Sequence, residues 1–473
     1  MRKTKIICTL GPSTDRDGVL EKLVREGMDV ARFNFSHGTH EEQKARLEQL
    51  KSLREQYGKP IAALLDTKGP EVRIGCFQQH KITLEEGQTF TLCTEETEGT
   101  NERVSVSYKE LYQDVKPGDQ ILIDDGLVGM EITEIAGTDI VCVVKNGGEI
   151  SDRKGVNVPG VKLNMKFISP RDYEDLLFGI KEDFDFVAAS FTRTADDIRE
   201  MRKLLDENGG RSINIIAKIE NQQGVDNIDE IIEEADGIMI ARGDMGVEIP
   251  LEHVPVIQQS IIQKVYRVGK QVITATQMLD SMMIHPRPTR AETTDVANAI
   301  YQGTSAIMLS GETAAGKYPV EALEMMVKIA EYMEAHIDYN AIFKKDERDD
   351  EPDVTNAISH ATCMTAIDLK ANAILAVSKT GSTARMISKY RPNCLIGGCS
   401  SSPKVCRQLN MSWGIYPMLV KEEYSSEILC LRAIEAAQRH GIVQEGDKIV
   451  FTGGVPLGIP GRTNLIRVCI VGE

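Results

Sequence analysis

The sequence predicts an α/β fold in which a closed parallel (β/α)8 barrel carries an inserted all-β lid domain and is followed by a C-terminal α/β domain. Three observations predict it. Short apolar runs alternate with amphipathic helices over residues 1–338. About a hundred residues of strand-like alternation interrupt this series after its third run. A second series of apolar runs and helices follows toward the C-terminus.

The first series contains eight apolar runs, each short and rich in aliphatic residues, as expected for strands buried on both faces. Eight βα units in a row predict a TIM barrel, whose functional groups lie at the carboxyl ends of its strands. Polar residues stand at or just past the ends of these runs. The runs are residues 3–10, 29–33, 61–66, 185–190, 213–219, 237–241, 271–276 and 305–309.

The third βα connection is far longer than an ordinary loop, because the next helix is expected to begin near Ser169. Within it, the segments KITLEEGQTFTLC, ERVSVSY, DQILIDDGLVGMEITEI and DIVCVVKNGG alternate as strands do, between Gly and Pro turns. Pro70 and Pro170 bracket the stretch. Residues 70–170 are therefore predicted to form an all-β lid at the functional end of the barrel, placed to exclude water from a reactive group.

The charged segment KKDERDDEPD, residues 344–353, predicts a solvated linker. Beyond it, ANAILAVS, NCLIGGCS, YPMLV and DKIVFTGG alternate with helical stretches and predict a doubly wound α/β domain. The predicted domains are residues 1–69 with 171–338 for the catalytic barrel, 70–170 for the lid and 339–473 for the C-terminal domain.

The composition and charge of the chain disfavour several classes of partner and site. The chain has 55 Lys and Arg against 71 Asp and Glu, and its net charge of −16 disfavours nucleic acid as the main partner. It contains neither a signal-peptide pattern nor 18 uninterrupted apolar residues, so we expect a cytoplasmic protein without a membrane partner. The ten cysteines form no CxxC pair, which favours reduced, mostly buried thiols over a zinc site.

One cation and two carboxylates follow two neighbouring runs of the predicted barrel. Lys218 and Glu220 end the run in IIAKIENQQG, and Asp244 follows the next run in IMIARGDMGVEIP. Adjacent strand ends bring these groups to one mouth of the barrel. Two hard carboxylates with open positions suit Mg²⁺ or Mn²⁺ shared with a substrate anion. Either acid alone would more commonly be a solvated charge or a helix cap.

The sequence resembles the pyruvate kinase family, of the bacterial type without an extra C-terminal domain, along nearly its whole length. The resemblance implies transfer of the phosphoryl group of phosphoenolpyruvate to ADP in glycolysis, with Mg²⁺ (or Mn²⁺) and K⁺ as cofactors. It also implies a homotetramer that responds to a phosphorylated effector. The matching segments, in the order of the family, are KTKIICTLGP, ARFNFSHG, LLDTKGPEVR, GVNVPG, KIENQQG, MIARGDMGVEIP, ITATQMLDSM, PRPTRAE, DVANAI and IMLSGETAAGKYP.

The resemblance assigns roles residue by residue. Lys218 and Arg32 match the cations at the transferring phosphoryl group, and Glu220 and Asp244 match the divalent metal ligands. Backbone N–H groups after the sixth run are expected to bind the substrate carboxylate. Glu42 stands where some members carry an aromatic residue near the adenine. The matched potassium ligands are Asn34, Ser36, Asp66 and Thr67; the nucleotide-side residues are Pro12, Asn34, His37, Arg73 and Lys154; the substrate-side residues are Ala241, Arg242, Gly243, Asp244 and Thr276.

Pyruvate must finally be protonated at its enolate carbon, and His37 is the one histidine in the strand-end motifs. A histidine acid is therefore not expected. Thr276, Ser310 and Glu312 are the residues placed nearest the proton path, acting through water. A role in orienting neighbouring residues explains each of these three side chains about as well as a role in the proton path.

The sequence SKTGSTAR predicts an anion cradle far from the barrel mouth, where a strand runs into a Ser, Thr and Gly loop that opens a helix. The loop alone is equally typical of a capped turn. The resemblance favours an effector site for a phosphorylated metabolite such as fructose 1,6-bisphosphate, ribose 5-phosphate or AMP. Its residues are Ser378, Lys379, Thr380, Gly381, Ser382 and Thr383.

Three other functions stay open at this stage. A Mg²⁺-dependent lyase or aldolase acting on a 2-keto acid would share the metal site and an enolate intermediate, but it would need neither the lid nor two phosphate-binding arginines. A Schiff-base aldolase would use Lys218 as a nucleophile. A non-catalytic metabolite sensor would retain the barrel but lack some of the residues that carry the chemistry. Every matched residue is present in this chain.

Overall fold

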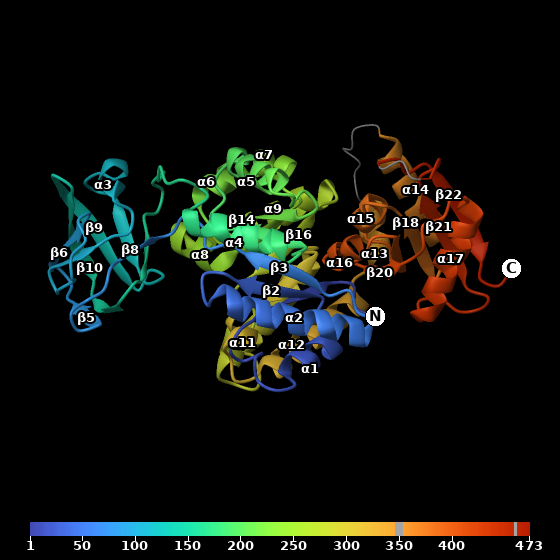
Figure 1. The fold of residues 1–473 in the computed structure, drawn as a ribbon, viewed down its shortest axis with the longest axis horizontal. Coiled ribbons are helices and arrows are strands. Elements are labelled where there is room, and N and C mark those ends of the chain that lie inside the picture. The colour runs from blue at the N-terminus through green and yellow to red at the C-terminus, as the bar shows by residue number, and fades with distance from the viewer. Residues whose placement is uncertain (346–352, 458–460) are drawn as a thin grey trace.

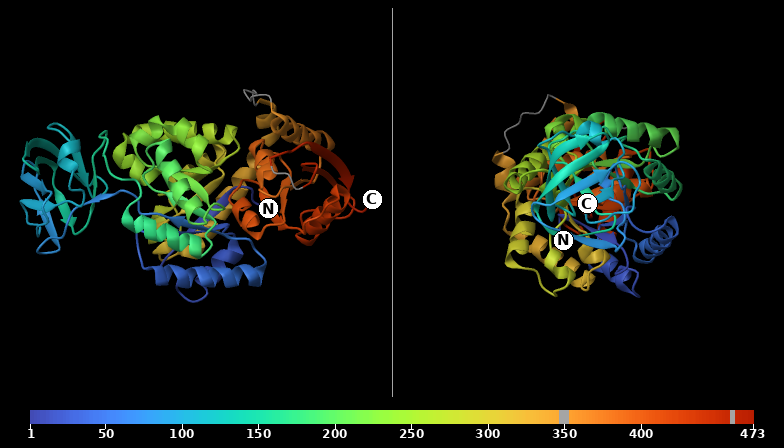
Figure 2. Two further views of the ribbon diagram at one scale, coloured as in Figure 1. Left: turned by 45° about the horizontal axis from the view of Figure 1, so that its top comes forward. Right: turned by 90° about the vertical axis from the view of Figure 1, so that its left-hand side faces the viewer.

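The computed structural model describes residues 1–345, 353–457 and 461–473 of the 473-residue chain. A β-rich body, a (β/α)8 barrel and a C-terminal α/β body lie in a row, with the barrel in the middle (Figure 1). The left view of Figure 2 keeps this order, and the right view looks along the row with the β-rich body in front. The predicted fold class is confirmed. The ranges 1–69 with 171–338, 70–170 and 339–473 remain our proposed domain boundaries.

Eight parallel strands close the barrel in the order β1-β17-β16-β15-β14-β13-β3-β2, and each coincides with one of the eight predicted runs, although β2 extends one residue beyond its run to Asn34. The strands are β1 (Lys5–Leu10), β2 (Val30–Asn34), β3 (Ala62–Asp66), β13 (Phe186–Ala189), β14 (Asn214–Ile219), β15 (Gly237–Ala241), β16 (Gln271–Ala275) and β17 (Ala306–Leu309). The surrounding helices are α1 (Val19–Glu26), α2 (His40–Tyr57), α4 (Pro170–Lys181), α5 (Ala195–Glu207), α6 (Gln222–Asp226), α7 (Ile228–Glu234), α8 (Arg242–Glu248), α9 (Val254–Arg267), α10 (Arg290–Tyr301), α11 (Gly311–Ala314) and α12 (Pro319–His336).

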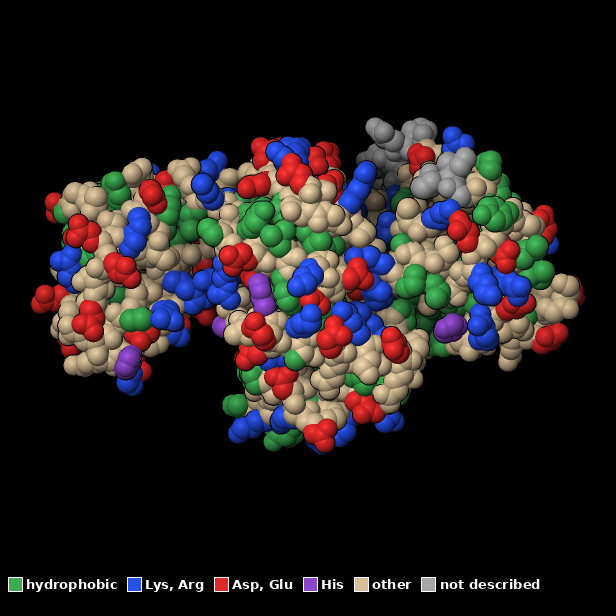
Figure 3. Space-filling view, in the orientation of Figure 1, with side chains coloured by type: hydrophobic (Ala, Val, Ile, Leu, Met, Phe, Trp, Pro, Cys, Tyr) green, Lys and Arg blue, Asp and Glu red, His purple; other side chains and the backbone are tan. Residues whose placement is uncertain are grey.

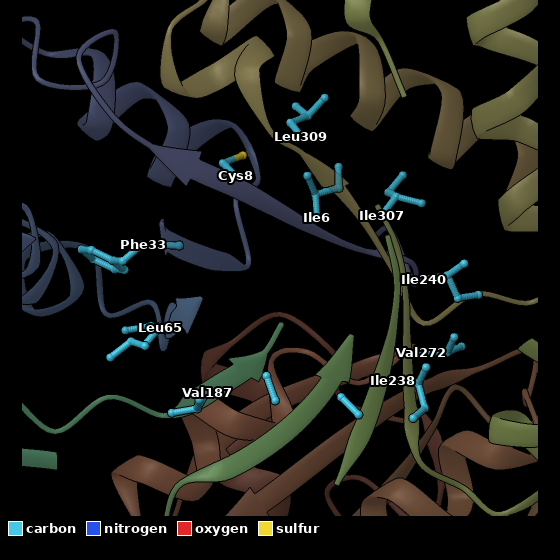
Figure 4. Packing of buried hydrophobic residues seen from close by; sticks show 14 of the residues in the cluster. Ile6, Cys8, Phe33, Leu65, Val187, Ile238, Ile240, Val272, Ile307 and Leu309 are labelled. Atoms are coloured by element: carbon cyan, nitrogen blue, oxygen red, sulfur yellow. The ribbon is translucent and has the colours of Figure 1, made fainter. Parts of the chain in front are cut away.

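Alternating side chains of these strands build two cores. Ile7 and the inward-facing side chains of the other barrel strands fill the barrel interior. Ile6, Cys8 and Phe33 belong to the larger cluster between the strands and the outer helices (Figure 4). Both faces are apolar, which explains the continuous hydrophobic runs. Met411, from the C-terminal body, joins the interior cluster and so closes one end of the barrel.

The β-rich body follows β3 and has a hydrophobic core of its own. Its main sheet has the order β4-β12-β8-β9-β10-β6-β7, and β11 pairs with β5 alongside. The helix after it begins where predicted, because Ser169 Oγ accepts a bond from Asp172 N at 3.0 Å and Pro170 occupies the first turn of α4. The elements are β4 (Val72–Arg73), β5 (Lys81–Leu84), β6 (Thr89–Cys93), β7 (Arg103–Ser105), α3 (Leu111–Asp114), β8 (Gln120–Ile123), β9 (Val128–Ala136), β10 (Asp139–Asn146), β11 (Gly148–Ser151) and β12 (Gly155–Asn157).

The C-terminal body is a five-stranded sheet of order β20-β19-β18-β21-β22, parallel except for β22. Hydrophobic clusters cover both of its faces. Its elements are α14 (Val354–Leu369), β18 (Ala373–Val377), α15 (Ser382–Lys389), β19 (Leu395–Ser400), α16 (Pro403–Leu409), β20 (Ile415–Leu419), α17 (Ser426–Arg439), β21 (Lys448–Gly453) and β22 (Leu465–Ile470). The predicted linker begins inside α13 (Tyr339–Lys345), and its residues 346–352 lie outside the described residues.

The C-terminal body docks on the end of the barrel where the strands begin. Lys5 Nζ donates to the Ile415 carbonyl at 2.7 Å, and Arg407 Nε lies 2.7 Å from Asp185 Oδ1. Lys3 accepts through its carbonyl from Gly414 N at 2.8 Å. The β-rich body instead emerges at the opposite end, where the strands stop. The mouth of the barrel is therefore the end that the β-rich body can cover.

All ten cysteines are free thiols, and Cys76 is the one exposed. On the face seen in Figure 3, basic and acidic side chains are intermixed. Within the described part of the chain, every helix is too short or too polar to span a lipid bilayer.

Candidate active site

The mouth of the barrel gathers charged side chains from three strands. Arg32 lies on β2, Asp66 ends β3, Lys218 lies on β14 and Glu220 follows it. Lys218 Nζ is 3.1 Å from Asp66 Oδ1 and 3.0 Å from Glu220 Oε1. Arg32 Nε is 2.5 Å from Asp66 Oδ2. The structure thus brings together the cations and carboxylates that the sequence placed at separate strand ends.

Asp66 is the buried anion that joins the two cations. Burial would raise the pKa of this carboxyl, but Arg32 and Lys218 together hold it below its ordinary value. Asp66 therefore stays ionised at neutral pH. It fixes the side chains of Arg32 and Lys218 before any substrate arrives, which is the preorganisation that stabilises developing charge.

Lys218 is held as an ammonium group. Burial would lower the pKa of Lys218, but the carboxylates of Asp66 and Glu220 raise it above its ordinary value. A Schiff-base nucleophile requires a neutral amine and therefore a lowered pKa. The surroundings of Lys218 argue against the Schiff-base aldolase.

Two residues of this site were not assigned a role from the sequence. Ser190 Oγ accepts from Lys218 Nζ at 2.7 Å and lies within hydrogen-bond distance of Asp66 Oδ1 and the Thr67 carbonyl. Phe191 donates its backbone N–H to Glu220 Oε2 at 2.5 Å. The position of Ser190 at the end of the fourth run was the available signal. Nothing in the sequence marks the backbone of Phe191.

Glu220 and Asp244 have the donor chemistry of a divalent metal site. Burial raises the pKa of Glu220 to about 7 against the lowering effect of Lys218, and the charge of Asp244 adds to the rise. A cation beside both carboxylates would relieve this cost. Among the described residues, no cluster of three His, Cys, Asp or Glu side chains is arranged to hold a metal. The pair therefore fits an open site completed by substrate oxygens.

Arg242 and Thr276 organise the neighbouring strand ends. The Arg242 guanidinium donates to Asp295 Oδ1 and to the Thr276 carbonyl, both at 2.7 Å. Gly243 donates its N–H to Thr276 Oγ1 at 2.7 Å, so this backbone donor has a partner here. Thr276 has a φ of +69°, a strained conformation for a β-branched residue. The residues predicted to bind the substrate carboxylate, Ala241, Arg242 and Gly243, lie together at the start of α8.

Glu312 is a buried carboxylate that connects two loops at the mouth. It accepts from Leu279 N at 3.1 Å and from Ser310 N at 2.8 Å, and burial raises its pKa. Ser310 Oγ is buried and has no hydrogen-bond partner. The geometry thus gives Glu312 an orienting role and leaves the Ser310 hydroxyl open for a water or a substrate.

The residues predicted to bind the nucleotide lie partly on the β-rich body and partly on the barrel. On the β-rich body, Arg73 pairs through two nitrogens with Glu71 at 2.8 Å, and Lys154 Nζ lies 2.9 Å from Asp124 Oδ1. On the barrel, Pro12 and His37 are exposed. Glu42 accepts from Thr39 N at 3.0 Å as part of a capping box of α2, which gives this residue a structural role.

The predicted potassium ligands lie on adjacent strand ends. Asn34 and Asp66 are register partners of β2 and β3, and Thr67 follows directly. Asn34 Oδ1 accepts from Ser36 N at 3.0 Å. Phe35 N donates to the Asp66 carbonyl at 3.0 Å. Oxygen atoms of the kind that a monovalent cation requires are thus concentrated beside Arg32.

The predicted effector loop borders a pocket in the C-terminal body. The loop joins β18 to α15, and Gly381 takes the left-handed conformation before the helix with no side-chain cap. Thr380 Oγ1 donates to Ser382 Oγ at 3.1 Å, and Lys379 Nζ lies 2.5 Å from Glu422 Oε1. Ser378, Lys379, Ser382 and Thr383 line the pocket together with Arg462, which the sequence analysis missed.

Comparison with known proteins identifies the family of the chain. The family model described as pyruvate kinase, barrel domain, matches residues 1–323, and that described as pyruvate kinase, alpha/beta domain, matches residues 356–469. The chain is 49% identical to a pyruvate kinase of Clostridium acetobutylicum over the full length of both chains. It is 48% identical to a pyruvate kinase of Sporosarcina psychrophila, covering all of this chain and 81% of that one.

A crystal structure of a pyruvate kinase from Cryptosporidium parvum superposes with a TM-score of 0.94 at 39% identity, covering 99% of this chain and 96% of that one. Family models, relatives and fold therefore agree with one another. The chain belongs to the pyruvate kinase family of phosphotransferases.

Proposed function

We propose that this chain transfers the phosphoryl group of phosphoenolpyruvate to ADP, giving ATP and pyruvate in glycolysis. The single observation that carries the proposal is Lys218, held as an ammonium between Asp66 and Glu220 at the barrel mouth in a chain of this family. Phosphoryl transfer passes through a loose transition state with charge on the equatorial oxygens, so fixed cations provide much of the catalysis. A 2-keto-acid lyase has no comparable use for the paired cations Arg32 and Lys218.

Each group at the mouth has a proposed task. Arg32 and Lys218 bind the transferring phosphoryl group from fixed positions around Asp66. Glu220 and Asp244 hold Mg²⁺ or Mn²⁺, which supplies charge neutralisation and orients the substrate oxygens. Asn34, Ser36, Asp66 and Thr67 hold K⁺. The backbone at 241–243 binds the substrate carboxylate, which requires Gly243 N–H to exchange its bond to Thr276 Oγ1.

The proton for the enolate enters on the side of Thr276. Ser310 has a buried hydroxyl with no partner, and Glu312 holds the Ser310 backbone. We place a water there, bound by Thr276 and Ser310, as the immediate proton donor. Glu312 acts as a positioning residue in this scheme. Its carboxylate accepts hydrogen bonds from two backbone N–H groups, so both carboxylate oxygens are engaged by the loops.

The β-rich body serves as the lid. A cleft between it and the barrel is lined from both sides, by Glu71 and Asp125 of the lid and by Asp244 and Glu248 of the barrel. Burial raises the pKa of Asp125, and the charge of Asp244 adds to the rise. Arg73 and Lys154 are on the lid side, so lid closure would bring them to the nucleotide phosphates.

A coupled assay tests the proposed reaction. We expect pyruvate to form from phosphoenolpyruvate and ADP with Mg²⁺ and K⁺ present. Removing the divalent ion with a chelator should lower the rate by at least 10³-fold, because Glu220 and Asp244 are then left to repel the substrate anion. Replenishing Mg²⁺ or Mn²⁺ should restore the rate. Pyruvate formation that persists at full rate in excess chelator would contradict the metal assignment.

Regulation and assembly complete the proposal. The loop 378–383 binds a phosphorylated metabolite, with Arg462 as an additional cation at the pocket. The functional unit is a homotetramer, as the family resemblance implies, and Leu251 and Val256 of the barrel expose 72% and 71% of their surface for such contacts. The enzyme acts in the cytoplasm, where free thiols persist.

Thr380→Glu combined with Ser382→Glu tests the effector loop. Two carboxylates in the cradle should repel a phosphate dianion and abolish activation, while turnover at saturating substrate stays within about twofold. Substrate curves with and without fructose 1,6-bisphosphate, ribose 5-phosphate or AMP measure this effect. Ser52→Glu combined with Thr138→Glu, at exposed positions of α2 and the lid, is the matched control. If none of these phosphates shifts the wild-type curve, the loop is only a helix cap.

A further inference from the structure

The chain enters and leaves the β-rich body through two segments, and one buried carboxylate joins them. Asp172, in the first turn of α4, is 2% exposed. Its Oδ1 accepts from Lys68 N at 3.0 Å and from Gly69 N at 3.2 Å, on the segment that enters the body. Its Oδ2 accepts from Ser169 Oγ at 2.6 Å, on the segment that leaves the body. Asp172 therefore holds the two connections of the β-rich body together.

Helix capping does not explain the direction of this carboxylate. In α2, α5 and α10 the acid at the third helical position completes a capping box, because it accepts from the backbone N–H of the N-cap residue. Asp172 has the same position in α4, after the N-cap residue Ser169, but its Oδ1 accepts from Lys68 and Gly69 instead. The Asp172 carboxylate thus reaches away from its own helix to the other connection.

The segment that Asp172 holds lies directly against the candidate active site. Gly69 has a φ of +73°, and a Cβ atom at this position would lie 2.8 Å from Ser190 Cβ and 2.9 Å from the Ser190 carbonyl oxygen. Ser190 Oγ lies 2.7 Å from both the Thr67 carbonyl oxygen and Lys218 Nζ. A displacement of Gly69 would therefore move Ser190, and with it a hydrogen-bond partner of Lys218.

The burial of this cluster fixes the distance between the two connections. Three donors from two segments satisfy the Asp172 carboxylate, and Gly69 is buried as well. If either segment moved away, a buried carboxylate oxygen or a buried N–H group would lose its partner, which is costly inside a protein. We therefore expect the two connections to move together, as one hinge, when the β-rich body moves.

We propose that Asp172 is a positioning residue for the proposed phosphoryl transfer and is the fixed point about which the lid turns. It sets the orientation of the lid, which carries Arg73 and Lys154, and it keeps Gly69 against Ser190 at the barrel mouth. The inference rests on the proposed function, because it takes the β-rich body as the lid over the nucleotide. Asp172 should affect ADP more than phosphoenolpyruvate, whose proposed ligands lie on the barrel.

Asp172→Ala and Asp172→Asn test this role in steady-state kinetics. Alanine removes both acceptor oxygens, so the KM for ADP should rise about tenfold or more while the KM for phosphoenolpyruvate stays within about threefold. Asparagine keeps an oxygen for the two N–H groups and presents an N–H donor to the Ser169 hydroxyl, so it should restore the KM for ADP. Asp196→Ala, at an exposed acid in the first turn of α5, is the matched control and should behave as wild type.

The ratio of the two KM values separates positioning from simple destabilisation. Partial unfolding would lower the apparent kcat and leave both KM values unchanged. An equal rise of both KM values in Asp172→Ala, or no rise in either, would overturn the inference. A wild-type protein that forms no pyruvate from phosphoenolpyruvate and ADP would instead overturn the proposed function.

Hydrogen exchange measures the same contact without any substrate. The amide protons of Lys68 and Gly69 are the donors to Asp172, so they should exchange about tenfold faster or more in Asp172→Ala and at the wild-type rate in Asp172→Asn. Unchanged exchange in Asp172→Ala contradicts the hinge. Should that variant fail to fold, the wild-type protein decides. Its Lys68 and Gly69 amides should exchange as slowly as the hydrogen-bonded amides of Thr67 and Ser190, and faster exchange refutes the hinge.

Discussion

Lys218→Met should lower kcat by about 10³-fold or more, which is roughly 4 kcal/mol of transition-state stabilisation. The ammonium group lies between Asp66, Glu220 and Ser190, and its charge matters most while the phosphoryl group is in flight. Methionine keeps an unbranched side chain, one atom shorter than that of lysine, and removes the charge. Phosphoenolpyruvate binding should weaken much less, because Arg32 stays paired with Asp66.

Steady-state kinetics together with direct binding of phosphoenolpyruvate measures the two effects separately. Lys203→Met, at a lysine whose side chain is 75% exposed on α5, is the matched control and should behave as wild type. Circular dichroism should show that the fold survives. If Lys218→Met loses binding and turnover in equal proportion, the lysine is a ground-state ligand and our assignment is wrong.

Removing K⁺ should lower kcat at least tenfold, even with saturating Mg²⁺ and with tetramethylammonium keeping the ionic strength constant. The family resemblance implies this dependence, because Thr67 and Glu71 in DTKGPE match its potassium-dependent branch, whereas K⁺-independent members are expected to carry a lysine in place of Glu71. A glutamate leaves the pocket one positive charge short, and K⁺ supplies it. In the structure, the Glu71 carboxylate lies 2.8 Å from the Arg73 guanidinium, so this carboxylate already has a cationic partner on the β-rich body.

Glu71→Lys provides the sharper half of this test. The new ammonium should replace the monovalent cation, so this variant should retain most of its activity in K⁺-free buffer. Glu134→Lys introduces the same charge change at an exposed position of β9 and should remain dependent on K⁺. Full wild-type activity without K⁺ would refute the potassium site at Asn34, Ser36, Asp66 and Thr67.

The barrel was predictable because its strands are buried on both faces, so that GIMIA is wholly apolar and KIICTL carries polar side chains only at Lys5 and Thr9. Charged residues at strand ends were equally visible, and Lys218, Glu220, Asp66 and Arg32 do converge. The sequence did not show in which direction each charged side chain points. Arg242 reaches Asp295, 53 positions along the chain, and Lys218 reaches Asp66, 152 positions away. Such pairings depend on the packing of distant helices and loops, which one local sequence does not encode.

The two ends of the C-terminal body illustrate the same limit. The Ser and Thr loop at 378–383 has a local signature, because strand, turn and helix follow one another in the chain. A small cavity at Arg391, where the C-terminal body meets the barrel, has none. Its cations are Lys270, which follows α9, and three residues in or just after α15, more than a hundred positions away, and the structure alone places them around one space.

The pairing of β1 with β17 sets an order of assembly during synthesis. Lys5 and Ala306 are register partners, so the barrel cannot close until some three hundred residues have left the ribosome. The lid strands lie within residues 72–157 and have a core of their own. This unit is complete long before the barrel, and we expect it to fold first. β1, β2 and β3 can pair with one another meanwhile, but the outer edges of β1 and β3 stay unpaired until β17 and β13 are made, which is where a chaperone would be needed most.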